Sequence, residues 1–570
     1  MRKIYLTVFL IFIISVFLFI ISFIYLDKHN HTTLYYDTAI KGQYIGTTKI
    51  DKFLTEEKIV YKSISSMPFR ELFTEKKIRI DLDKKYNFET YQKELTANKA
   101  LYLIYAENKD DSVSFLSKFM SSFRYLSGMP IRKGTFIFEE DSPVTYMPII
   151  ENYDFRRGRS QGFNSLVFLP SNDIPPLKRF VTLTSIKNEY LKIGHRKIKT
   201  ENLLLKIKGL PPGNVWVAKS DKSLIMIEIP SIGLKMTRNF NVKQINPKER
   251  IVTSDKYTSK NVTFDSKNRQ LSGTLTSPAE AQGSLEGKTY PAALLVWGSG
   301  PQDRNYQGFF ESLSDHLSKN GYCVLRFDRR GVGASGGKTI TATQDDDLAD
   351  ITAAANFLKS QKNVNPGRIA VIAHSEGTIN TLRLAAGNPD IRSIILMAPL
   401  VKTDLRDYEK MIREKAVMEK WDEEYLRSVL MSLKETDEIV HGTKHDWTHL
   451  LGKRCYLKAM RVDGIFDPKE AIVQISAPIL IMHGKNDMDV PAEYGASLDK
   501  TLAEYGKMKH SAIYYSYLGH FFGKLLNDGL SKMYYDVDKE VLTNMIDWLD
   551  LNNAEPIKPA PQKEGAAKPL

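Results

Sequence analysis

Short segments that are almost entirely apolar recur through the second half of the chain, and longer amphipathic stretches separate them. The apolar segments are PAALLVWG, YCVLRFD, RIAVIAH, RSIILMAP, APILIMHG and SAIYYSY. Strands that alternate with helices pair in parallel through right-handed crossovers, and strands that are apolar on both faces lie in a sheet covered on both sides. From residue 261 onward the sequence therefore predicts an α/β fold with a mostly parallel sheet. That sheet begins with a hairpin formed by NVTFDS and QLSGTLTSP.

The alternation is interrupted between residues 401 and 476. Asp422 is a favourable N-cap, and the residues after it place apolar side chains at helical spacing. Those side chains are Tyr425, Leu426, Val429, Leu430 and Leu433. We expect this segment to form a helical cap inserted between two core strands.

Residues 27–254 have a different character, because their apolar runs are short and β-favouring. Runs such as IRIDLD, TFIFEE and SLIMIEIP lie between Gly, Pro or Asn residues. One stretch, DSVSFLSKFMSSFRYL at residues 111–126, has the spacing of a helix. We expect a mostly antiparallel, β-rich domain of unknown function. The α/β domain then occupies residues 255–552, and a tail rich in Pro, Ala and Lys at residues 553–570 is expected to be disordered.

The first 26 residues contain an uncharged apolar run from Ile4 to Leu26. At the rise of an α-helix this run spans about 34 Å, enough for the hydrocarbon core of a bilayer. It is longer than the apolar part of a signal peptide, and no small-x-small cleavage site lies near its end. Arg2 and Lys3 favour an N-terminus on the cytoplasmic side. We expect an uncleaved transmembrane anchor with the bulk of the protein outside the cytoplasm; the alternative is secretion after signal cleavage.

The net charge of +13 is concentrated in the N-terminal half of the chain. Residues 27–254 contain 38 Lys and Arg against 25 Asp and Glu. A solvated, lysine-rich surface explains this excess most simply, and contact with an anionic membrane surface is the second interpretation. The basic and aromatic residues form no recognisable nucleic-acid-binding module, so we expect no nucleic-acid partner.

The stretch VIAHSEGT places Ser375 directly after an apolar strand and before a segment with helical spacing. A serine on such a sharp strand-to-helix turn is exposed above the sheet, and the residues two positions before and after it must be small. Ala373 and Gly377 meet that requirement, although the usual first residue is Gly. Ser375 is therefore a candidate nucleophile, and the alternative is an ordinary helix-capping hydroxyl.

Two backbone N–H groups are candidate donors to a developing oxyanion. The N-terminus of the helix after Ser375 favours negative charge, so the Glu376 N–H is the first. The Gly-rich loop WGSGPQDRN after another strand supplies the second, for which we select the Ser299 N–H.

A serine nucleophile needs a neighbouring base, usually a histidine oriented by a carboxylate. Asp487 follows the strand APILIM, and His520 follows the strand SAIYYSY. Both therefore lie at the carboxyl edge of the sheet, as Ser375 does. The chain order Ser, Asp, His is the one found when this triad is built on an α/β sheet.

These residues resemble the α/β-hydrolase superfamily in its serine esterase and serine-peptidase branches. The resemblance covers about residues 261–550 and rests on AHSEG, FDRRGVGASGG, HGKNDMDVP and LGH. It implies an α/β-hydrolase fold with Ser375 as nucleophile, Asp487 as acid and His520 as base. Trp297 and Ala373 depart from the residues often found at their positions.

Other polar residues near these motifs have simpler interpretations. Asp489 could replace Asp487 as the acid, but the spacing to Gly484 and Val490 favours Asp487. His374 and His483 are expected to pack in the structure, and Asp328 and Arg329 to brace a turn below the site.

Two further clusters could bind metals. His441, His445 and His449 are spaced by four residues, but no carboxylate completes a site. Asp345, Asp346 and Asp347 open a helix, where negative charge is favourable without any cation. We expect neither a metal nor a cofactor.

The preferred function is hydrolysis of a small-molecule or lipid-like carboxylic ester through a Ser375–His520–Asp487 triad. Three alternatives remain open: a serine peptidase, a thioesterase, and a non-enzymatic protein that binds a lipid or a partner at the membrane. The sequence does not indicate the oligomeric state.

Overall fold

The computed structural model describes most of the chain between residues 31 and 553. The gaps are residues 70–71, 98–99, 169–173, 241–253, 280–288, 401–404, 463–467, 488, 507–508 and 524–536. The expected membrane anchor at residues 1–26 and the expected tail beyond residue 553 lie outside the described residues. None of the helices in the described part of the chain combines the length and the apolar character that crossing a membrane requires.

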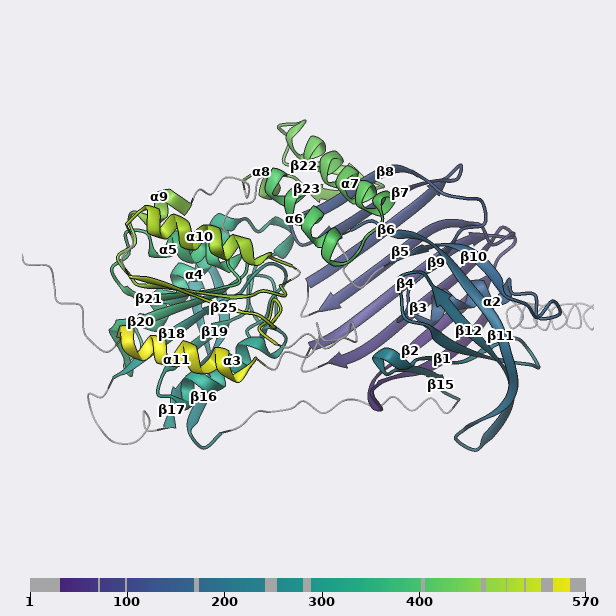
Figure 1. Cartoon of the computed structure of the whole chain (residues 1–570), viewed down its shortest axis with the longest axis horizontal. Coiled ribbons are helices and arrows are strands. Elements are labelled where there is room, and N and C mark those ends of the chain that lie inside the picture. Colours follow the sequence, from purple (N-terminus) through teal and green to yellow (C-terminus); the bar gives the residue numbers. More distant parts are fainter. Residues whose placement is uncertain are drawn as a thin grey trace, which may run out of the picture.

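The first half of the described chain forms one 15-stranded sheet (Figure 1). Its strand order is β8-β7-β6-β5-β4-β3-β2-β1-β15-β14-β13-β12-β11-β10-β9, so nearly every strand pairs with its neighbour in sequence. Pairing is antiparallel except between β9 and β10. The strands are β1 (His31–Ile40), β2 (Gln43–Leu54), β3 (Lys58–Phe69), β4 (Leu72–Asp83), β5 (Phe88–Ala97), β6 (Ala100–Lys109), β7 (Ser112–Phe119), β8 (Ser122–Pro130), β9 (Phe136–Phe138), β10 (Gln161–Val167), β11 (Leu177–Ile193), β12 (Arg196–Ile207), β13 (Gly213–Ala218), β14 (Leu224–Ile229) and β15 (Leu234–Arg238).

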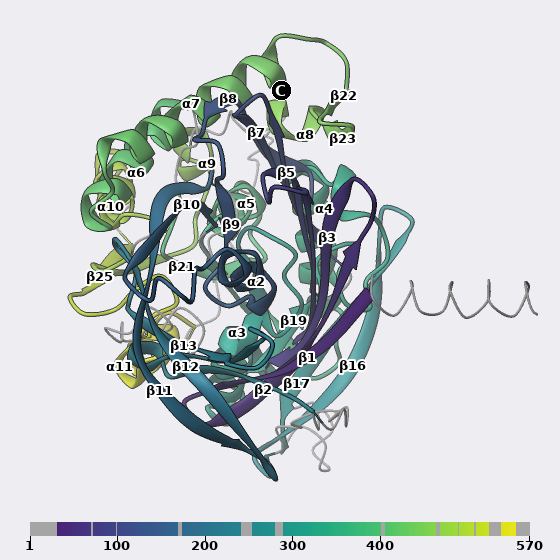
Figure 2. The same cartoon turned by 90° about the vertical axis from the view of Figure 1, so that its right-hand side faces the viewer.

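The sheet curves around one short helix, α2 (Pro143–Glu151), as Figure 2 shows. Residues 143–150 of this helix are all buried, so it fills the concave side of the sheet. Alternate apolar residues of the strands pack there, since successive strand residues point to opposite faces. A 3₁₀ turn, η1 (Pro230–Ile232), joins β14 to β15.

The helix predicted at residues 111–126 was wrong. This segment forms the antiparallel hairpin of β7 and β8, and Met120 in its turn has a φ of 53°. The apolar residues of the segment also satisfy the two-residue period of a strand, because Val113 and Phe115 both face the core. Pairing with β6 favoured the strand.

The second sheet has eight strands in the order β16-β17-β19-β18-β20-β21-β24-β25. The predicted hairpin is β16 and β17, and the strands from β19 to β25 pair in parallel. The strands are β16 (Tyr257–Ser266), β17 (Arg269–Pro278), β18 (Tyr290–Val296), β19 (Cys323–Phe327), β20 (Val364–His374), β21 (Ile391–Met397), β24 (Ile479–Gly484) and β25 (His510–Tyr515).

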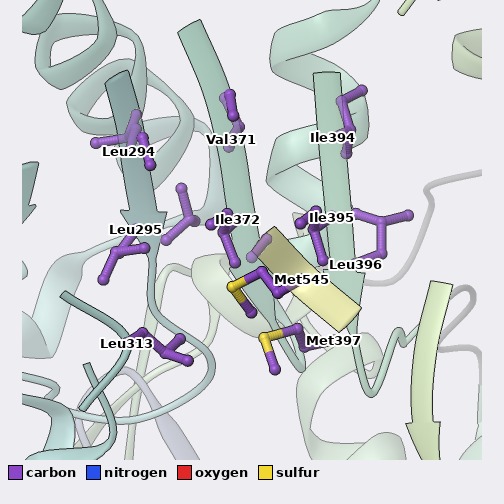
Figure 3. Close-up of a cluster of buried hydrophobic side chains, with 14 of the residues drawn as sticks. Leu294, Leu295, Leu313, Val371, Ile372, Ile394, Ile395, Leu396, Met397 and Met545 are labelled. Carbon is purple, nitrogen blue, oxygen red and sulfur yellow. The ribbon is translucent and has the colours of Figure 1, made fainter. Parts of the chain in front are cut away.

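Helices cover both faces of this sheet (Figure 1). On one face lie α3 (Phe309–Lys319) and α11 (Lys539–Asn553), and on the other lie α4 (Gln344–Lys359), α5 (Gly377–Ala385) and α10 (Ala492–Glu504). Two 3₁₀ turns are η3 (Tyr306–Gly308) and η4 (Thr339–Thr341). Figure 3 shows how Leu313 of α3 and Met545 of α11 pack on the central strands. These side chains are fully buried, as the apolar strand sequences predict.

The segment between β21 and β24, where a helical cap is expected, is mostly helical in its described residues and also contains the hairpin of β22 and β23. It contains α6 (Leu405–Met418), α7 (Glu423–His441), β22 (Trp447–Leu450), β23 (Lys453–Tyr456), α8 (Lys458–Val462) and α9 (Pro468–Ile472). Asp422 is the N-cap of α7, as predicted, because its carboxylate accepts the Tyr425 N–H at 2.9 Å. The apolar face of α7 packs on the first sheet, where Tyr425 and Val429 join the core around α2.

Candidate active site

Ser375 lies between the end of β20 and the start of α5, on the sharp turn that its sequence predicts. Its φ of 54° falls in the left-handed region, which is unusual for a residue other than Gly. The Ser375 N–H donates to the Met397 carbonyl at 2.9 Å, and the Thr378 N–H donates to the Ser375 carbonyl at 3.0 Å. These bonds hold the strained turn between two strands and a helix.

The small residues around Ser375 are required by close packing. A Cβ atom added to Gly377 would lie 2.3 Å from the Trp297 carbonyl oxygen, so the start of α5 passes directly over the end of β18. Ala373 pairs with Val296 of β18 inside the sheet and is fully buried. Alanine in place of the usual glycine is therefore accommodated there.

Asp487 and His520 meet at the same edge of the sheet. The His520 Nδ1–H donates to Asp487 Oδ2 at 2.7 Å. The other carboxylate oxygen of Asp487 accepts the N–H groups of Asp489 and Val490, each at 2.8 Å. The Asp489 side chain instead lies 3.4 Å from Lys415 of the cap. The structure thus pairs His520 with Asp487 and not with the alternative acid.

Burial and charge act against each other in this pair. Burial alone would raise the pKa of Asp487, but the positive charge of His520 and hydrogen bonds from His483 and His520 hold it well below its usual range. Burial alone would lower the pKa of His520, but the Asp487 carboxylate outweighs it and raises that pKa. The pair therefore favours an ionised carboxylate beside an imidazole of increased basicity.

His374 connects the nucleophile strand to the histidine loop. Its Nε2 lies 2.9 Å from the His520 carbonyl oxygen, and its Nδ1 lies 3.1 Å from the Tyr306 hydroxyl. Burial lowers the pKa of His374 to about 3, so the ring is neutral. A carbonyl only accepts, so Nε2 carries the hydrogen and Nδ1 accepts from Tyr306. The packing expected for His374 is present, because the ring lies 5.0 Å from that of Phe521.

The bond between His374 and His520 was not predicted from the sequence. Adjacency to Ser375 was its only signal, and adjacency does not show that a loop 146 residues away closes on the ring. His483 is buried, and its Nε2 donates to the Val490 carbonyl at 2.9 Å, which supports the acid loop as a structural residue.

The loop after β18 passes against the nucleophile. A Cβ atom on Gly298 would lie 2.9 Å from Ser375 Cβ and 2.6 Å from the Tyr306 hydroxyl oxygen, so only glycine fits. Ser299, the next residue, is exposed. Within the described ranges, neither the Ser299 N–H nor the Glu376 N–H donates to an acceptor of the protein. Both are therefore free to donate to a ligand.

Asp328 and Arg329 brace this loop. Arg329 Nη1 donates to the Gly300 carbonyl at 2.9 Å, and its Nε donates to Asp347 at 3.1 Å. Asp328 Oδ1 accepts the Arg304 N–H at 2.8 Å. The turn expected to lie below the site thus fixes the backbone that carries Ser299.

The expected hydrogen bond between Ser375 and His520 is not formed in the described structure. Among the residues that the structure describes, the Ser375 hydroxyl makes no hydrogen bond to His520. The His520 ring lies 4.5 Å from the ring of His374, the residue next to Ser375. Catalytic hydrogen bonds are often long without substrate, and the serine hydroxyl rotates about a single bond.

The two other clusters do not gather as metal sites. His441 ends α7, His445 lies in a loop and His449 lies in β22. Asp345, Asp346 and Asp347 each form an ion pair with an arginine: Arg383, Arg330 and Arg329 respectively. In the described part of the chain, no three His, Cys, Asp or Glu side chains are placed to hold a metal ion.

Comparisons with known proteins concern the second half of the chain. Residues 303–521 match the family model of serine aminopeptidase, S33. The chain is 24% identical over 214 residues to the putative carbamate hydrolase RutD of Agrobacterium fabrum, covering 35% of this chain and 77% of that protein. It is 27% identical over 211 residues to protein ABHD12B of Homo sapiens, covering 36% of this chain and 48% of that protein.

Among solved structures, Est1E from Butyrivibrio proteoclasticus aligns with a TM-score of 0.35 and 16% identity. The alignment covers 52% of this chain and 98% of Est1E. The Pyrococcus furiosus esterase PF2001 aligns with a TM-score of 0.37 and 17% identity, covering 54% of this chain and 98% of that one.

Proposed function

The second half of the chain is a member of the α/β-hydrolase superfamily, and from this premise we propose that the protein is a serine hydrolase that cleaves carboxylic esters through an acyl-enzyme. The observation that carries the proposal is the 2.7 Å hydrogen bond between His520 and Asp487 at the sheet edge that also presents Ser375.

The reaction has two steps. His520 Nε2 takes the hydroxyl proton of Ser375 as the Ser375 oxygen attacks the ester carbonyl carbon, and the imidazolium then gives this proton to the leaving alkoxide. Water attacks the resulting acyl-enzyme, with His520 again taking and returning a proton. Asp487 holds the Nδ1–H tautomer and stabilises the imidazolium. The N–H groups of Ser299 and Glu376 stabilise the negative oxygen in both steps.

The test is the Ser375→Ala variant. It should lose hydrolysis of short-chain p-nitrophenyl esters and covalent labelling by a fluorophosphonate probe, because no oxygen remains to attack. The matched control is Ser360→Ala, at the end of α4 and away from the site, which should keep both. Equal labelling of wild type and Ser375→Ala would reject the nucleophile.

A serine peptidase is the second candidate, since the family model that matches residues 303–521 is that of a serine aminopeptidase. The same triad chemistry cleaves amides when the imidazolium protonates the leaving amine. A panel of aminoacyl p-nitroanilides beside the esters distinguishes the two. Faster kcat/KM on the amides, lost in Ser375→Ala, would favour the peptidase.

We also propose that residues 4–26 anchor the protein in a membrane, with the catalytic half outside the cytoplasm. The support is the length and apolar character of this run and the basic residues before it. Fractionation of expressing cells, with and without residues 1–26, is the test. Equal recovery of both forms in the soluble fraction would reject the anchor.

A further inference from the structure

The first sheet reaches the candidate active site through the end of one strand. Phe119 is the last residue of β7. A Cβ atom on Gly300 would lie 3.1 Å from both Cε1 and Cζ of the Phe119 ring, so the ring lies directly against this glycine. Gly300 follows Ser299, whose N–H is the proposed oxyanion donor. A side chain from the N-terminal half of the chain thus borders the catalytic loop of the other half.

The contact is fixed on both sides. The Phe119 ring lies 5.1 Å from the ring of Tyr102, whose hydroxyl is 2.8 Å from that of Ser117. On the other side, Arg329 bonds the Gly300 carbonyl and lies over the Trp297 ring at 4.9 Å. Phe119 therefore occupies a defined position beside the oxyanion loop.

The cap holds the same hairpin from the outside. The Thr436 hydroxyl of α7 accepts the Tyr125 N–H of β8 at 2.9 Å, and Glu435 accepts the Ser127 N–H at 2.9 Å. Since α7 covers the edge strand β8, the β7–β8 hairpin is bound to both the cap and the oxyanion loop.

The loop beside Phe119 is open to solvent at Ser299, which is exposed, and Phe119 itself is only partly buried. On the acid side, the site is bordered by α6, whose Lys415 lies 3.4 Å from Asp489 and whose Met411 packs near Val490. Because the Phe119 ring lies against Gly300, the residue after Ser299, it borders the loop at which the ester carbonyl oxygen would bind.

We propose that Phe119 is a specificity-determining residue: its ring contacts the apolar acyl or alcohol group of the substrate, so the N-terminal sheet selects which esters are cleaved. The inference rests on the proposed function. An aromatic ring offers a flat, apolar surface with no charge to pair, so the group that it favours is an alkyl chain or an aryl ring.

The test measures kcat/KM over two ester series in the full chain. One series lengthens the acyl group from acetate to octanoate on a constant p-nitrophenyl alcohol. The other keeps acetate and enlarges the alcohol from methyl to naphthyl. In Phe119→Ala the preference for the larger group should fall roughly tenfold in one series, which identifies the group at the ring. The control Phe53→Ala alters β2, which is separated from β7 by β6, β5, β4 and β3, and its two profiles should match those of wild type.

Selectivity separates this role from simple support of the loop. An equal fall of kcat/KM for every ester in Phe119→Ala would mean that the ring only props Gly300, and it would overturn the inference, as would unchanged profiles. If the alanine variant fails to fold, the ratio of kcat/KM between the large and the small esters can be measured in Phe119→Leu and Phe119→Trp instead. Ser375→Ala runs in parallel: if it is inactive while the Phe119 profiles stay unchanged, only the specificity role fails, and if it remains active, the proposed function itself fails.

Discussion

The two sheets bury charged side chains in different ways. In the first sheet, Glu139 is buried and accepts hydrogen bonds from Lys93 at 3.0 Å and Ser142 at 2.8 Å, and from Tyr91. In the second sheet, Asp487 is equally buried, but one of its two histidine partners, His520, lies at a sheet edge beside an exposed loop. Both carboxylates have strong partners, yet only the second lies at the sheet edge that carries Ser375.

Topology explains this difference. In an antiparallel meander, each sheet end joins strands that are close in sequence, and the first sheet is almost entirely of that kind. In a parallel sheet, every strand ends at the same edge, so residues 375, 487 and 520 converge although the chain between them is long. A buried carboxylate with strong partners is thus not evidence of catalysis by itself. Asp487 differs from Glu139 because it lies at an edge where several parallel strands end.

The largest expected effect comes from Asp487→Asn. The amide keeps the shape but cannot stabilise an imidazolium or select the Nδ1–H tautomer, so kcat should fall roughly 10⁴-fold. Steady-state hydrolysis of p-nitrophenyl esters measures it. Asp489→Asn is the control, and a comparable loss there would show that the acid has been assigned to the wrong carboxylate.

The same variant has a defined pH signature. Only a neutral His520 can accept the serine proton, so activity falls as pH drops through the pKa of His520. Asp487 raises that pKa, so the acid limb of kcat/KM should move to lower pH in the residual activity of Asp487→Asn. If the acid limb of the kcat/KM profile stayed at the same pH, a group other than His520 would control it.

Glu139→Ala in the first sheet should lower the stability of the protein and leave its kcat unchanged, whereas Asp487→Asn lowers kcat. It leaves Lys93 and Lys76 buried without this carboxylate, at a cost of about 3–5 kcal/mol in the free energy of unfolding. Urea unfolding measures the loss, while kcat at a temperature where the variant is folded should stay close to wild type. A severe fall in kcat for folded protein would contradict the separation of the two charge clusters.

His374→Ala is expected to have an intermediate effect. Loss of the bond to the His520 carbonyl lets the histidine loop shift, and kcat should fall roughly 10- to 100-fold. His374→Gln, which can still donate a hydrogen bond, should recover part of the rate, and His445→Ala in an exposed loop of the cap is the control. Equal rates for the alanine and glutamine variants would contradict the positioning role.

His374 also predicts a pH dependence of stability. Its pKa is about 3 when folded and 6.5 in its ordinary range, so between these values the unfolded chain binds a proton that the folded protein does not. The contribution of neutral His374 to the free energy of unfolding should therefore be complete above about pH 6.5 and should decline as the pH falls toward 3. His374→Phe, which cannot titrate, should show a shallower decline in urea unfolding series at several pH values.

The sequence predicted the second sheet far better than the first. The mostly parallel pairing of its strands and the pairing of Asp487 with His520 follow from local patterns, because apolar runs alternate with amphipathic stretches and both residues follow apolar strands. The N-cap at Asp422 follows from a capping residue before an apolar helical face. The β7–β8 hairpin was mistaken for a helix because apolar residues at 113, 115 and 116 fit both periods. Contacts between distant segments, such as Phe119 on Gly300, have no local signature at all.

The smallest expected effect tests how firmly the two halves are joined. Thr436→Val keeps the shape of the buried side chain but leaves the Tyr125 N–H of β8 without its acceptor, which should cost about 1–2 kcal/mol. Because the bond joins the cap to the first sheet, its loss should weaken their contact before it unfolds either core, and amide hydrogen exchange should rise first in β8 and α7. Thr352→Val, on α4 far from this contact, is the control, since its hydroxyl bonds only within its own helix. Faster exchange across the whole protein would instead show that the two sheets unfold as one cooperative unit.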